Sequence, residues 1–470
     1  MDDDRASTQK QLAKIGRDYY EAKHDIRKYR MFYYNADGEL VEDTTRSNIK
    51  ISHPFFTILA DQLSAFMTSF RDNPVRAKKG AEELQEHLDA YFDAEFWGEI
   101  GELLNGAYVE GSGYLYGYKV ECGRIVFECA DAMGVIEVRA KDTDAGCDHI
   151  IYWYTDRIDK GHREINRIQV WDDKEVSYWV QSGNGNIEPD TDAEINPRPH
   201  VVYTDEKGQK LGSPLGFIPF WRLDNNRARG SGLAPIKGII DDYDLHACSL
   251  SNNLKDFDTP LHVVKGFEGS SLDELQTNLK TKKMIGVGEG GDLDVRTVDI
   301  PYQARKEKLD LDREAIFTFG MGFDPARVGD GNVTNIVILS RYALLELKAN
   351  KLQGRLNKLL KQLLKVVLAE INEECGTDYR PTDVTFEFTR SVMSNESENI
   401  ANQKMQAETE QIRINTILNA AAEIGDDETL RMLCVEFDID YDDLKGQLEK
   451  LQEEGVSGAR KTLEGIETGD

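Results

Sequence analysis

The sequence lacks the cysteine motifs that stabilise small secreted proteins and the apolar segments that anchor a chain in a membrane. Its six cysteines include no Cys-x-x-Cys pair, and no histidine stands at zinc-ligand spacing, so we interpret them as reduced, cytosolic thiols. They are Cys122, Cys129, Cys147, Cys248, Cys375 and Cys434. Nowhere do about 18 consecutive apolar residues occur, so we expect no membrane span. The start, MDDDRASTQK, has neither a basic leader nor an apolar stretch, and we expect no signal peptide.

Basic residues are in deficit. Lys and Arg number 57 against 85 Asp and Glu, which gives a formal net charge of −28. Such a charge repels nucleic acid at long range, so sequence-specific DNA binding is disfavoured as the main activity. With 40% hydrophobic and 30% charged residues the composition is globular. The length of 470 residues allows about two to four domains.

Motifs of catalysis and cofactor binding are missing or stand in the wrong context. The eight histidines form no His-Glu-x-x-His pair, and neither a Gly-x-Ser-x-Gly elbow nor a phosphate-binding Lys-Ser/Thr loop occurs. GVGEGG at 286–291 matches a dinucleotide-binding pattern, but DLDVRTVDIP after it favours a strand where a helix is required, so we interpret it as a hairpin turn. Asp241, Asp242 and Asp244 do not converge on a helix, and we interpret them as a solvated face. We predict no catalytic, cofactor-binding or metal-binding residues and no enzyme.

The first half of the chain changes from helical to β-type patterning. Helices are predicted at 9–30 and 54–70, and apolar residues recur at helical spacing over 82–110. Over 111–205, short β-type runs separated by Gly, Asp and Asn turns predict an antiparallel region. Within it, the polar, turn-rich segment 182–199 is expected to be an exposed excursion from the sheet.

A long helix is predicted at 234–258, because apolar residues recur there in alternating steps of four and three. This 3.5-residue seam is suited to packing along a neighbouring helix. Its members are Ile236, Ile240, Tyr243, Ala247, Leu250, Leu254 and Phe257. After Pro260 the pattern predicts a small α+β insert with strands near 261–267, 284–287 and 294–300 and a short helix at SLDELQTNLKT. A second charged helix at 302–319 places that insert at the tip of a helical hairpin.

A proline-free helical stretch from Ile336 to about Glu374 follows the glycine-containing break at 320–335. It is far longer than the usual helix of about 11–12 residues. Its apolar seam consists of Leu345, Ala349, Leu352, Leu356, Leu359, Leu363 and Val367. An adjoining stripe from Arg341 to Lys365 holds seven basic residues and one acidic residue, a net charge of +6. The stripe contacts either phosphates or acidic helices, and we favour protein contact because Lys and Arg commonly border apolar seams.

The last 80 residues form an acidic tail. Residues 391–470 hold 7 basic and 19 acidic side chains, a net charge of −12. Helical stretches are predicted near 397–424, 427–437 and 440–454. We interpret the segment as a helical tail domain.

Several segments resemble one known family. They are HPFFTILADQLSAFM (53–67), GSGYLYGY (111–118), GFIPF with Asn225-Asn226, LAPIKGIIDDYDLHACSLSNNLKDF (233–257), VVKGF (263–267), TVDIP (297–301), ARKEKLDLDREAIFTFG (304–320) and NVTN with SRYALLELKAN (332–350). They occur in order across about two-thirds of the chain. The chain resembles the portal proteins of long-tailed bacteriophages, the head-to-tail connectors.

The resemblance implies an α+β subunit of a dodecameric ring, built from four zones. These are an outer α/β wing, a two-helix stem, a small α/β clip and a helical crown. Mapped onto this chain, they predict a wing at 1–233, a stem helix at 234–260, a clip at 261–300, a return helix at 301–321, a channel loop at 322–335, a long helix and wing return at 336–390, and an acidic crown and tail at 391–470.

The function implied is a ring-shaped channel at one capsid vertex, through which double-stranded DNA passes without sequence specificity during packaging and ejection. The implied partners are the terminase large subunit, a head-completion adaptor, and capsid and scaffolding proteins, with no membrane. The protein is expected in the virion after assembly in the host cytoplasm. The alternatives are a structural coat or scaffold component without a DNA channel and, from the enzyme class, a carboxylate-metal nuclease or phosphatase.

Four sets of site residues follow from this hypothesis. The channel loop is predicted at Gly329, Asp330, Gly331, Asn332, Val333, Thr334 and Asn335, because its glycines and short polar residues change conformation readily. Stem cations facing the channel are Lys306 and Lys308. Clip residues for docking are Lys280, Lys282 and Lys283. The ring-packing seam is Ile240, Tyr243, Ala247, Leu250 and Leu254.

Overall fold

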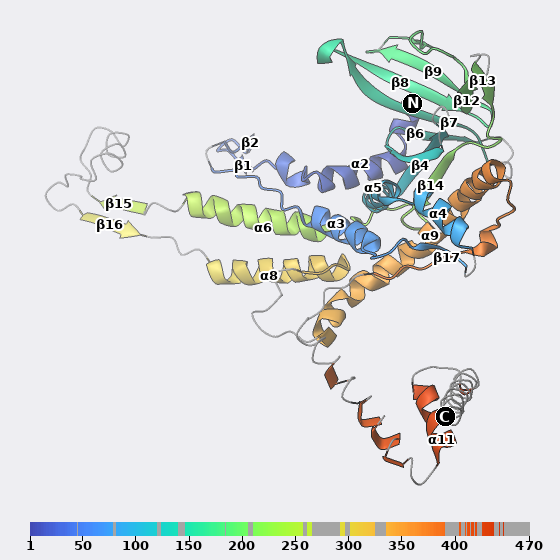
Figure 1. The fold of residues 1–470 in the computed structure, drawn as a ribbon. Coiled ribbons are helices and arrows are strands. Elements are labelled where there is room, and N and C mark those ends of the chain that lie inside the picture. The colour runs from blue at the N-terminus through green and yellow to red at the C-terminus, as the bar shows by residue number, and fades with distance from the viewer. Residues whose placement is uncertain are drawn as a thin grey trace, which may run out of the picture. The chain divides into compact units, whose positions relative to one another are not determined.

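A computed structural model describes residues 1–44, 46–78, 81–119, 124–139, 146–183, 185–204, 210–256, 261–265, 292–296, 301–324, 335–390 and parts of 404–445. The chain forms two compact units. The first comprises Met1–Gly329 and Ser340–Val392, and the second comprises Asp330–Leu339 and Met393–Asp470. The first unit combines groups of helices with a long run of antiparallel strands (Figure 1), which is consistent with the predicted α+β class.

The N-terminal helices are shorter than predicted. Helix α2 (Thr8–Tyr20) begins at Ser7, whose side chain accepts a hydrogen bond from Lys10 N, and ends ten residues before the predicted limit. The 3₁₀ helix η1 (Asp25–Lys28) and an antiparallel hairpin of β1 (Phe32–Tyr34) and β2 (Leu40–Glu42) follow it. The prediction of a helix over 9–30 was therefore wrong beyond Tyr20, and the hairpin was missed.

The predicted helix at 54–70 is confirmed as α3 (Phe55–Thr68). The stretch at 82–110 divides into α4 (Glu82–Tyr91) and α5 (Ala94–Glu110), because Asp93 caps the second helix by accepting from Phe96 N at 2.9 Å. Gly111 ends α5 at φ +92°, where any Cβ would collide with the backbone of Arg229. The chain can therefore turn directly from α5 into the first strand of the β region.

The predicted antiparallel region is confirmed. A central sheet has the order β10-β9-β8-β7-β6, and a second has the order β14-β4-β5. Their bounds are β4 Ser112–Lys119, β5 Ile125–Ala130, β6 Val135–Arg139, β7 Cys147–Ile158, β8 Arg163–Trp171, β9 Glu175–Ser182, β10 Ile187–Pro189 and β14 Phe220–Asp224. A separate hairpin pairs β12 (Val201–Thr204) with β13 (Lys210–Ser213).

Most described residues of the segment 182–199 are exposed, as predicted, but the segment stays at the sheet edge and is not an excursion from the sheet. Within it, β10 and β11 (Arg198–Pro199) both pair with β9. Asp190, only 9% exposed, accepts a 2.8 Å hydrogen bond from Arg167 Nη1. Because polar residues can pair backbone at a sheet edge without entering a core, the composition alone misled the prediction.

Helix α9 (Asn335–Cys375) confirms the long predicted helix and supplies much of the core. All seven predicted seam residues are 0–3% exposed. They pack in one cluster with buried residues of α3, α4 and α5. The chain then returns through β17 (Val384–Phe386), which pairs antiparallel with β3 (Val75–Ala77). The long helix is thereby fixed at both its apolar face and its C-terminal return.

The two helices that flank the insert are confirmed as α6 (Lys237–Asp256) and α8 (Tyr302–Phe319). Of the insert itself, the structure describes β15 (Leu261–Lys265) and β16 (Asp292–Arg296), which pair antiparallel. These agree with two of the three predicted strands. The strand at 284–287, the short helix and GVGEGG lie outside the described residues.

The second unit is described only in part. Its α11 (Asp426–Glu436) confirms the helix predicted near 427–437. Asp427 accepts hydrogen bonds from Lys445 Nζ at 2.7 Å and from the Tyr441 hydroxyl at 2.5 Å. Most of the helices predicted at 397–424 and 440–454 lies outside the described residues. Throughout the described chain, every helix is too short or too polar to cross a membrane.

Candidate functional site

Helices α6 and α8 lie side by side and run antiparallel (Figure 1). Lys308 Nζ on α8 contacts Asp242 Oδ2 on α6 at 2.5 Å and also pairs with Asp312 of its own helix. Further along, Arg305 Nη1 donates to Ser249 Oγ at 3.4 Å. The hydrogen bonds from Lys308 to Asp242 and Asp312 raise the pKa of its ammonium group, so it stays charged. The two helices are thus joined by polar contacts along their length.

The two predicted stem cations differ in their surroundings. Lys308 is neutralised by two aspartates of its own subunit, so its charge is used to join α6 to α8. Lys306, on the same helix, has an exposed side chain. A cation already paired twice attracts an external phosphate less than a solvated one. Between the two residues, Lys306 is the one whose charge is more accessible to solvent.

The first half of α6 is fixed through Asp244, which is fully buried. Its carboxylate lies 2.6 Å from Nδ1 of the buried His24 and 2.7 Å from Nδ1 of His53. The backbone N–H of His53 also donates to it at 3.0 Å. Burial raises the pKa of the Asp244 carboxyl, but the hydrogen bonds from His24 and His53 lower it more, so the pKa lies below its usual value. The carboxylate therefore joins α6 to two separate N-terminal segments.

Asp241, Asp242 and Asp244 of α6 pair with different partners. Asp241 accepts from the Tyr19 hydroxyl and from Lys237 Nζ, whereas Asp242 pairs with Lys308. Asp244 pairs with the histidines. The prediction that they do not form one site is confirmed, but the prediction of a solvated face was wrong because Asp244 is buried. Across the residues that the structure describes, no group of His, Cys, Asp and Glu is placed to hold a metal ion.

An extended segment, residues 47–53, is bound along α6, and we call it the strap. Ser47 N donates to Asp256 Oδ1 at 3.2 Å, Ile49 N to Asn252 Oδ1 at 2.6 Å, and Ile51 N to Cys248 Sγ at 3.2 Å. Contacts thus recur every two residues in the strap and every four in the helix. Two extended residues span about 6.6 Å and four helical residues about 6.0 Å, so the two repeats match. The strap supports α6 to its C-terminal end.

The predicted ring-packing seam divides along α6. Ile240 is 0% exposed within the subunit's own core, so its assignment to a contact between subunits is corrected. The Tyr243 ring packs edge-on against Phe55, with centroids 4.8 Å apart. Ala247 and Leu250 are half-buried, and Leu254 is 51% exposed. Only the C-terminal part of the seam is left available to another molecule.

The residues just before the predicted channel loop are held in place. Residues 325–334, which include Gly329 to Thr334, lie outside the described residues, and Asn335 begins α9. On the N-terminal side, Arg313 makes two hydrogen bonds with Asp324 at 2.8 and 3.1 Å, and Phe323 N donates to Gln62 Oε1 at 3.1 Å. Phe323 also stacks on Tyr342 of α9, with centroids 4.9 Å apart. The chain at the N-terminal side of the loop is therefore fixed against α3, α8 and α9.

Lys348 on α9 joins that helix to the residue after α8 and to α5. Its Nζ donates to the carbonyl oxygen of Gly320 at 2.9 Å and to the Tyr108 hydroxyl at 3.1 Å. Burial lowers the pKa of Lys348 to about 7. This member of the predicted basic stripe therefore binds the residue that follows α8. The favoured alternative, contact with protein, holds at this position.

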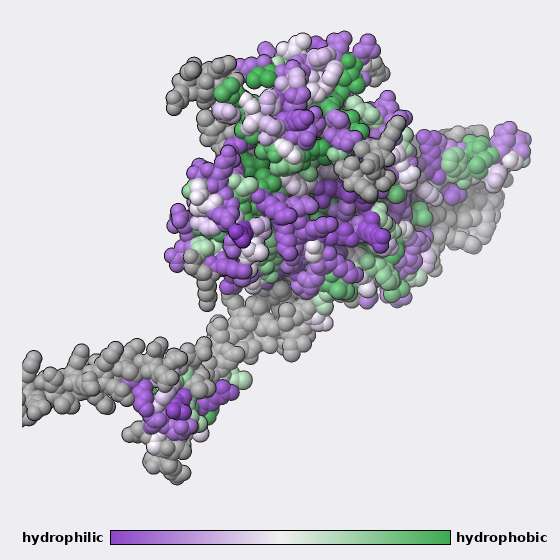
Figure 2. Space-filling view, turned by 90° about the vertical axis from the view of Figure 1, so that its right-hand side faces the viewer, coloured by the Kyte–Doolittle hydropathy of each residue, from purple (hydrophilic) through white to green (hydrophobic). Residues whose placement is uncertain are grey.

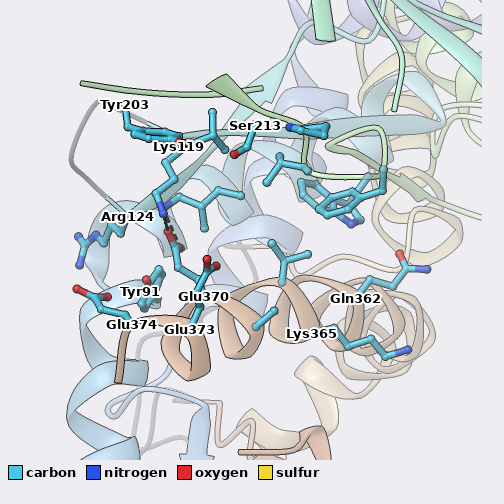
Figure 3. Close-up of a pocket in the computed structure, with 18 of the residues that line it drawn as sticks. Tyr91, Lys119, Arg124, Tyr203, Ser213, Gln362, Lys365, Glu370, Glu373 and Glu374 are labelled. Carbon is cyan, nitrogen blue, oxygen red and sulfur yellow. Dashed lines mark hydrogen bonds and ion pairs between the residues drawn. The ribbon is translucent and has the colours of Figure 1, made fainter. Parts of the chain in front are cut away.

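A groove of about 1490 Å³ lies between the β12–β13 hairpin and α9. Figure 2 shows hydrophobic residues gathered in a band across this side of the molecule. Figure 3 shows Lys119 paired with Glu370 at 2.5 Å, while Glu370 also accepts from Ile125 N at 3.1 Å. Trp221 and Phe217 line the apolar part, and Lys365 from the predicted basic stripe stands at the side formed by α9. The groove thus has an apolar part and a part where Lys119 and Glu370 are paired with each other.

The predicted clip residues Lys280, Lys282 and Lys283 lie outside the described residues. The sequence reasoning missed His24, His53, the strap and the β1–β2 hairpin. Dispersed histidines gave no signal for the pairing with Asp244, since the partners are about 200 residues apart along the chain. The hairpin did have a signal, because Asp37-Gly38 stands between aromatic and aliphatic residues.

A family model of phage portal proteins matches residues 3–455 of this chain, so its class is phage portal protein. The particular family is that of phage portal proteins of the SPP1 Gp6-like type, and the chain belongs to it. It is similar to the portal protein of Bacillus phage SPP1, 26% identical over 384 residues, which cover 81% of this chain and 74% of that protein. It is also similar to the portal protein of Clostridium phage phiCD119, 24% identical over 402 residues, which cover 81% and 82%. The resemblance to portal proteins that was predicted from separate sequence segments is confirmed.

Proposed function

We propose that copies of this chain form a ring around a channel at one capsid vertex, through which double-stranded DNA enters and leaves the head. In this proposal α6 and α8 are the stem, β15 and β16 belong to the clip, and residues 1–233 with 336–390 form the wing. Residues 391–470 form the crown. The protein acts as a structural component of the virion.

The observation that carries the proposal is the uncovered end of the α6–α8 pair. At the C-terminal end of α6, Leu254 is 51% exposed, and at the start of α8, Tyr302 is 54% exposed. Both belong to helices whose other ends are buried in the core, where Ile240 and Ile316 are 0% exposed. A helix pair with apolar side chains beyond the core of its own subunit is stabilised by neighbouring copies around a ring.

The proposed channel surface repels DNA more than it binds it. Helices α6 and α8 together hold six basic and eight acidic residues, a net charge of −2. Each phosphate neutralised by a basic side chain adds attraction, with a salt slope of about −0.9 per contact. Because positive and negative charges on α6 and α8 nearly cancel and few cations, such as Lys306, are exposed, this channel surface lets DNA slide. Loop residues Gly329 to Asn335 adjust against the DNA at the narrowest point.

The loop proposal has a direct test in packaged particles. Deleting residues 329–334 leaves Phe323, Asp324 and Tyr342 in the chain, so we expect the subunit fold to be retained. We expect the ring to assemble while DNA retention falls, measured as the fraction of full heads. Normal packaging and retention in this variant would contradict the loop's role.

Docking of the terminase large subunit and then of a head-completion adaptor is proposed for the clip, with Lys280, Lys282 and Lys283 as contacts. Capsid and scaffolding proteins would contact the wing. Reversing the three clip charges is expected to weaken both docking steps in pull-down with purified partners, without changing the ring. Unchanged binding of both partners would reject these residues.

Negative-stain electron microscopy of the purified full-length protein tests the central claim. Closed rings with a central hole are required by the channel. The alternative, a coat or scaffold component without a channel, produces sheets, shells or solid particles. Solid particles, or a single compact subunit under every assembly condition, would overturn the proposed function.

A further inference from the structure

The β1–β2 hairpin exposes an unusual amount of aromatic surface. Tyr34 is 74% exposed, Leu40 59% and Phe32 53%. The register pairs Tyr34 with Leu40 and Phe32 with Glu42, so these side chains lie on one face. Tyr33 and Val41 on the other face are also exposed. Apolar patches of this kind on a water-facing hairpin mark a surface that another molecule covers.

The hairpin is nevertheless well formed. The Asn35 side-chain oxygen accepts from Asp37 N at 3.0 Å and from Glu39 N at 2.8 Å, and Asn35 N donates to the Glu39 carbonyl at 2.9 Å. At its base, Asp43 N donates to the Met31 carbonyl at 2.8 Å, and Arg30 pairs with Glu42 at 3.2 Å. Two-stranded hairpins are marginal in water, so this turn chemistry pre-organises the aromatic face for binding.

The strap determines where along α6 the β1–β2 hairpin lies. The strap begins five residues after the end of β2, and its first residue, Ser47, is bound at Asp256, the last residue of α6. The hairpin therefore emerges near the C-terminal end of that helix. Leu254 is two residues from the strap-binding Asn252, which places the two about 200° apart around the helix. The exposed end of the seam thus faces away from the strap.

We infer that the aromatic face of the β1–β2 hairpin docks on the exposed end of the α6 seam, Leu250 and Leu254, of a second copy of this chain. The inference rests on the proposed ring. Rotation about a ring axis parallel to α6 and α8 does not change the height of a residue along that axis. The hairpin and Leu254 both lie near the C-terminal end of α6, but on different sides of it, so the hairpin of one copy can meet Leu254 of the next. Two different surfaces that meet in this way make the head-to-tail contact from which closed rings are built.

The charges near the patch favour this occupant over nucleic acid. Asp37, Glu39 and Glu42 surround the aromatic face, while Arg30 is paired with Glu42. Acidic side chains repel phosphates, whereas aromatic residues that bind single strands need cationic neighbours. The seam end offers aliphatic side chains, with the exposed Tyr302 at the same end of the helix pair. An aromatic face meeting an aliphatic one buries apolar area on both sides.

Disulfide trapping in the full-length protein tests the contact. Tyr34→Cys combined with Leu254→Cys should give, on mild oxidation, a ladder of covalent oligomers on non-reducing gels. Each single variant controls for the six natural cysteines, and Ile187→Cys with Leu254→Cys is the matched pair, since Ile187 is 49% exposed on β10. A ladder restricted to the Tyr34 pair supports the inference. No ladder, or a cross-link confined to monomers, overturns it.

A second measurement removes the patch without touching the core. Tyr34→Ser with Leu40→Ser should weaken assembly by about tenfold or more per interface, seen as loss of rings by native mass spectrometry. The matched control is Tyr203→Ser with Leu211→Ser on the β12–β13 hairpin, where the side chains are 43% and 40% exposed. Unchanged rings in the Tyr34 variant would assign the patch to another protein and overturn the inference. That outcome leaves the proposed function standing, whereas absence of rings in the unmodified protein sinks the proposed function itself.

Discussion

Helices α9 and α6 have the same kind of apolar seam, but the subunit fills them to different extents. Along α9 every predicted seam residue from Leu345 to Val367 is 0–3% exposed. Along α6 the seam is buried at Ile240 and 51% exposed at Leu254. A seam with 3.5-residue spacing therefore predicts that a helix packs against something, but it does not identify the partner. In α9 the partner is the subunit itself, and in α6 we propose that it is partly another copy.

Removing one side chain from the filled seam is expected to have the largest effect on the subunit. Leu363→Ala creates a cavity at a position that is 0% exposed, and such changes cost about 3–5 kcal/mol of unfolding free energy. Urea unfolding followed by tryptophan fluorescence measures the loss. Leu347→Ala on the same helix, where the side chain is 49% exposed, should change stability by less than about 0.5 kcal/mol. Equal effects of the two variants would contradict the filled seam.

The anchored half of α6 should be nearly as sensitive. Asp244→Ala leaves His24 buried without its carboxylate, at a cost of about 2–3 kcal/mol. Because the pKa of Asp244 is lowered in the folded protein, its stabilisation is present above the unfolded value of about 3.9 and is lost as pH falls through the lower folded value. Unfolding at pH 7 and pH 3 measures both effects. Lys255→Ala, at the exposed end of the same helix, is the control and should cost little.

Lys348 sharpens the comparison from within α9, because its pKa of about 7 lies below the ordinary lysine value. A lowered lysine pKa means that the unfolded chain binds more protons between pH 7 and about 10.4, so stability rises with pH across that range. Lys348→Met should abolish this rise, which amounts to about 1.4 kcal/mol for each unit of pKa shift. Unfolding titrations at pH 7 and pH 10 test the prediction. A Met variant that retains the full slope would show that another group titrates.

At the open end of α6 the effect on the subunit itself should be smallest. Leu254→Asp is expected to change unfolding free energy by less than about 0.5 kcal/mol, because the side chain is already half in water. Its effect appears in assembly, where native mass spectrometry should find monomers or incomplete rings. Leu245→Asp is the matched control, since Leu245 is 38% exposed and lies about 180° around the helix from Leu254. Intact rings in the Leu254 variant would remove the main distinction between the two helices.

Periodic segments were predicted closely from sequence. Helix α8 has the predicted bounds, and α9 begins and ends within one residue of its predicted limits. Local patterns fix such elements because the spacing of apolar residues, proline and glycine acts within a few residues. The sheet edge at 187–199 and the hairpin at 32–42 were misread, because short strands have weak periodicity and depend on partners that pair with them.

The candidate site was predicted less well than the fold. The sequence reasoning separated neither Lys306 from Lys308 nor Ile240 from Leu254, although the structure gives each pair opposite surroundings. Charge and hydropathy are properties of one residue, whereas a salt bridge or a buried position depends on segments distant in the chain. Asp242 and Lys308, for example, are separated by 66 positions.

The sequence by itself determined which segments become helices and strands, the deficit of positive charge, and the membership of the portal family, because these follow from residue order and composition. Only the tertiary structure decided which seam is filled, which lysines are free, and where the strap holds α6. Those outcomes depend on long-range contacts, such as Asp244 with His24 and His53, whose free energy is gained only when distant segments meet.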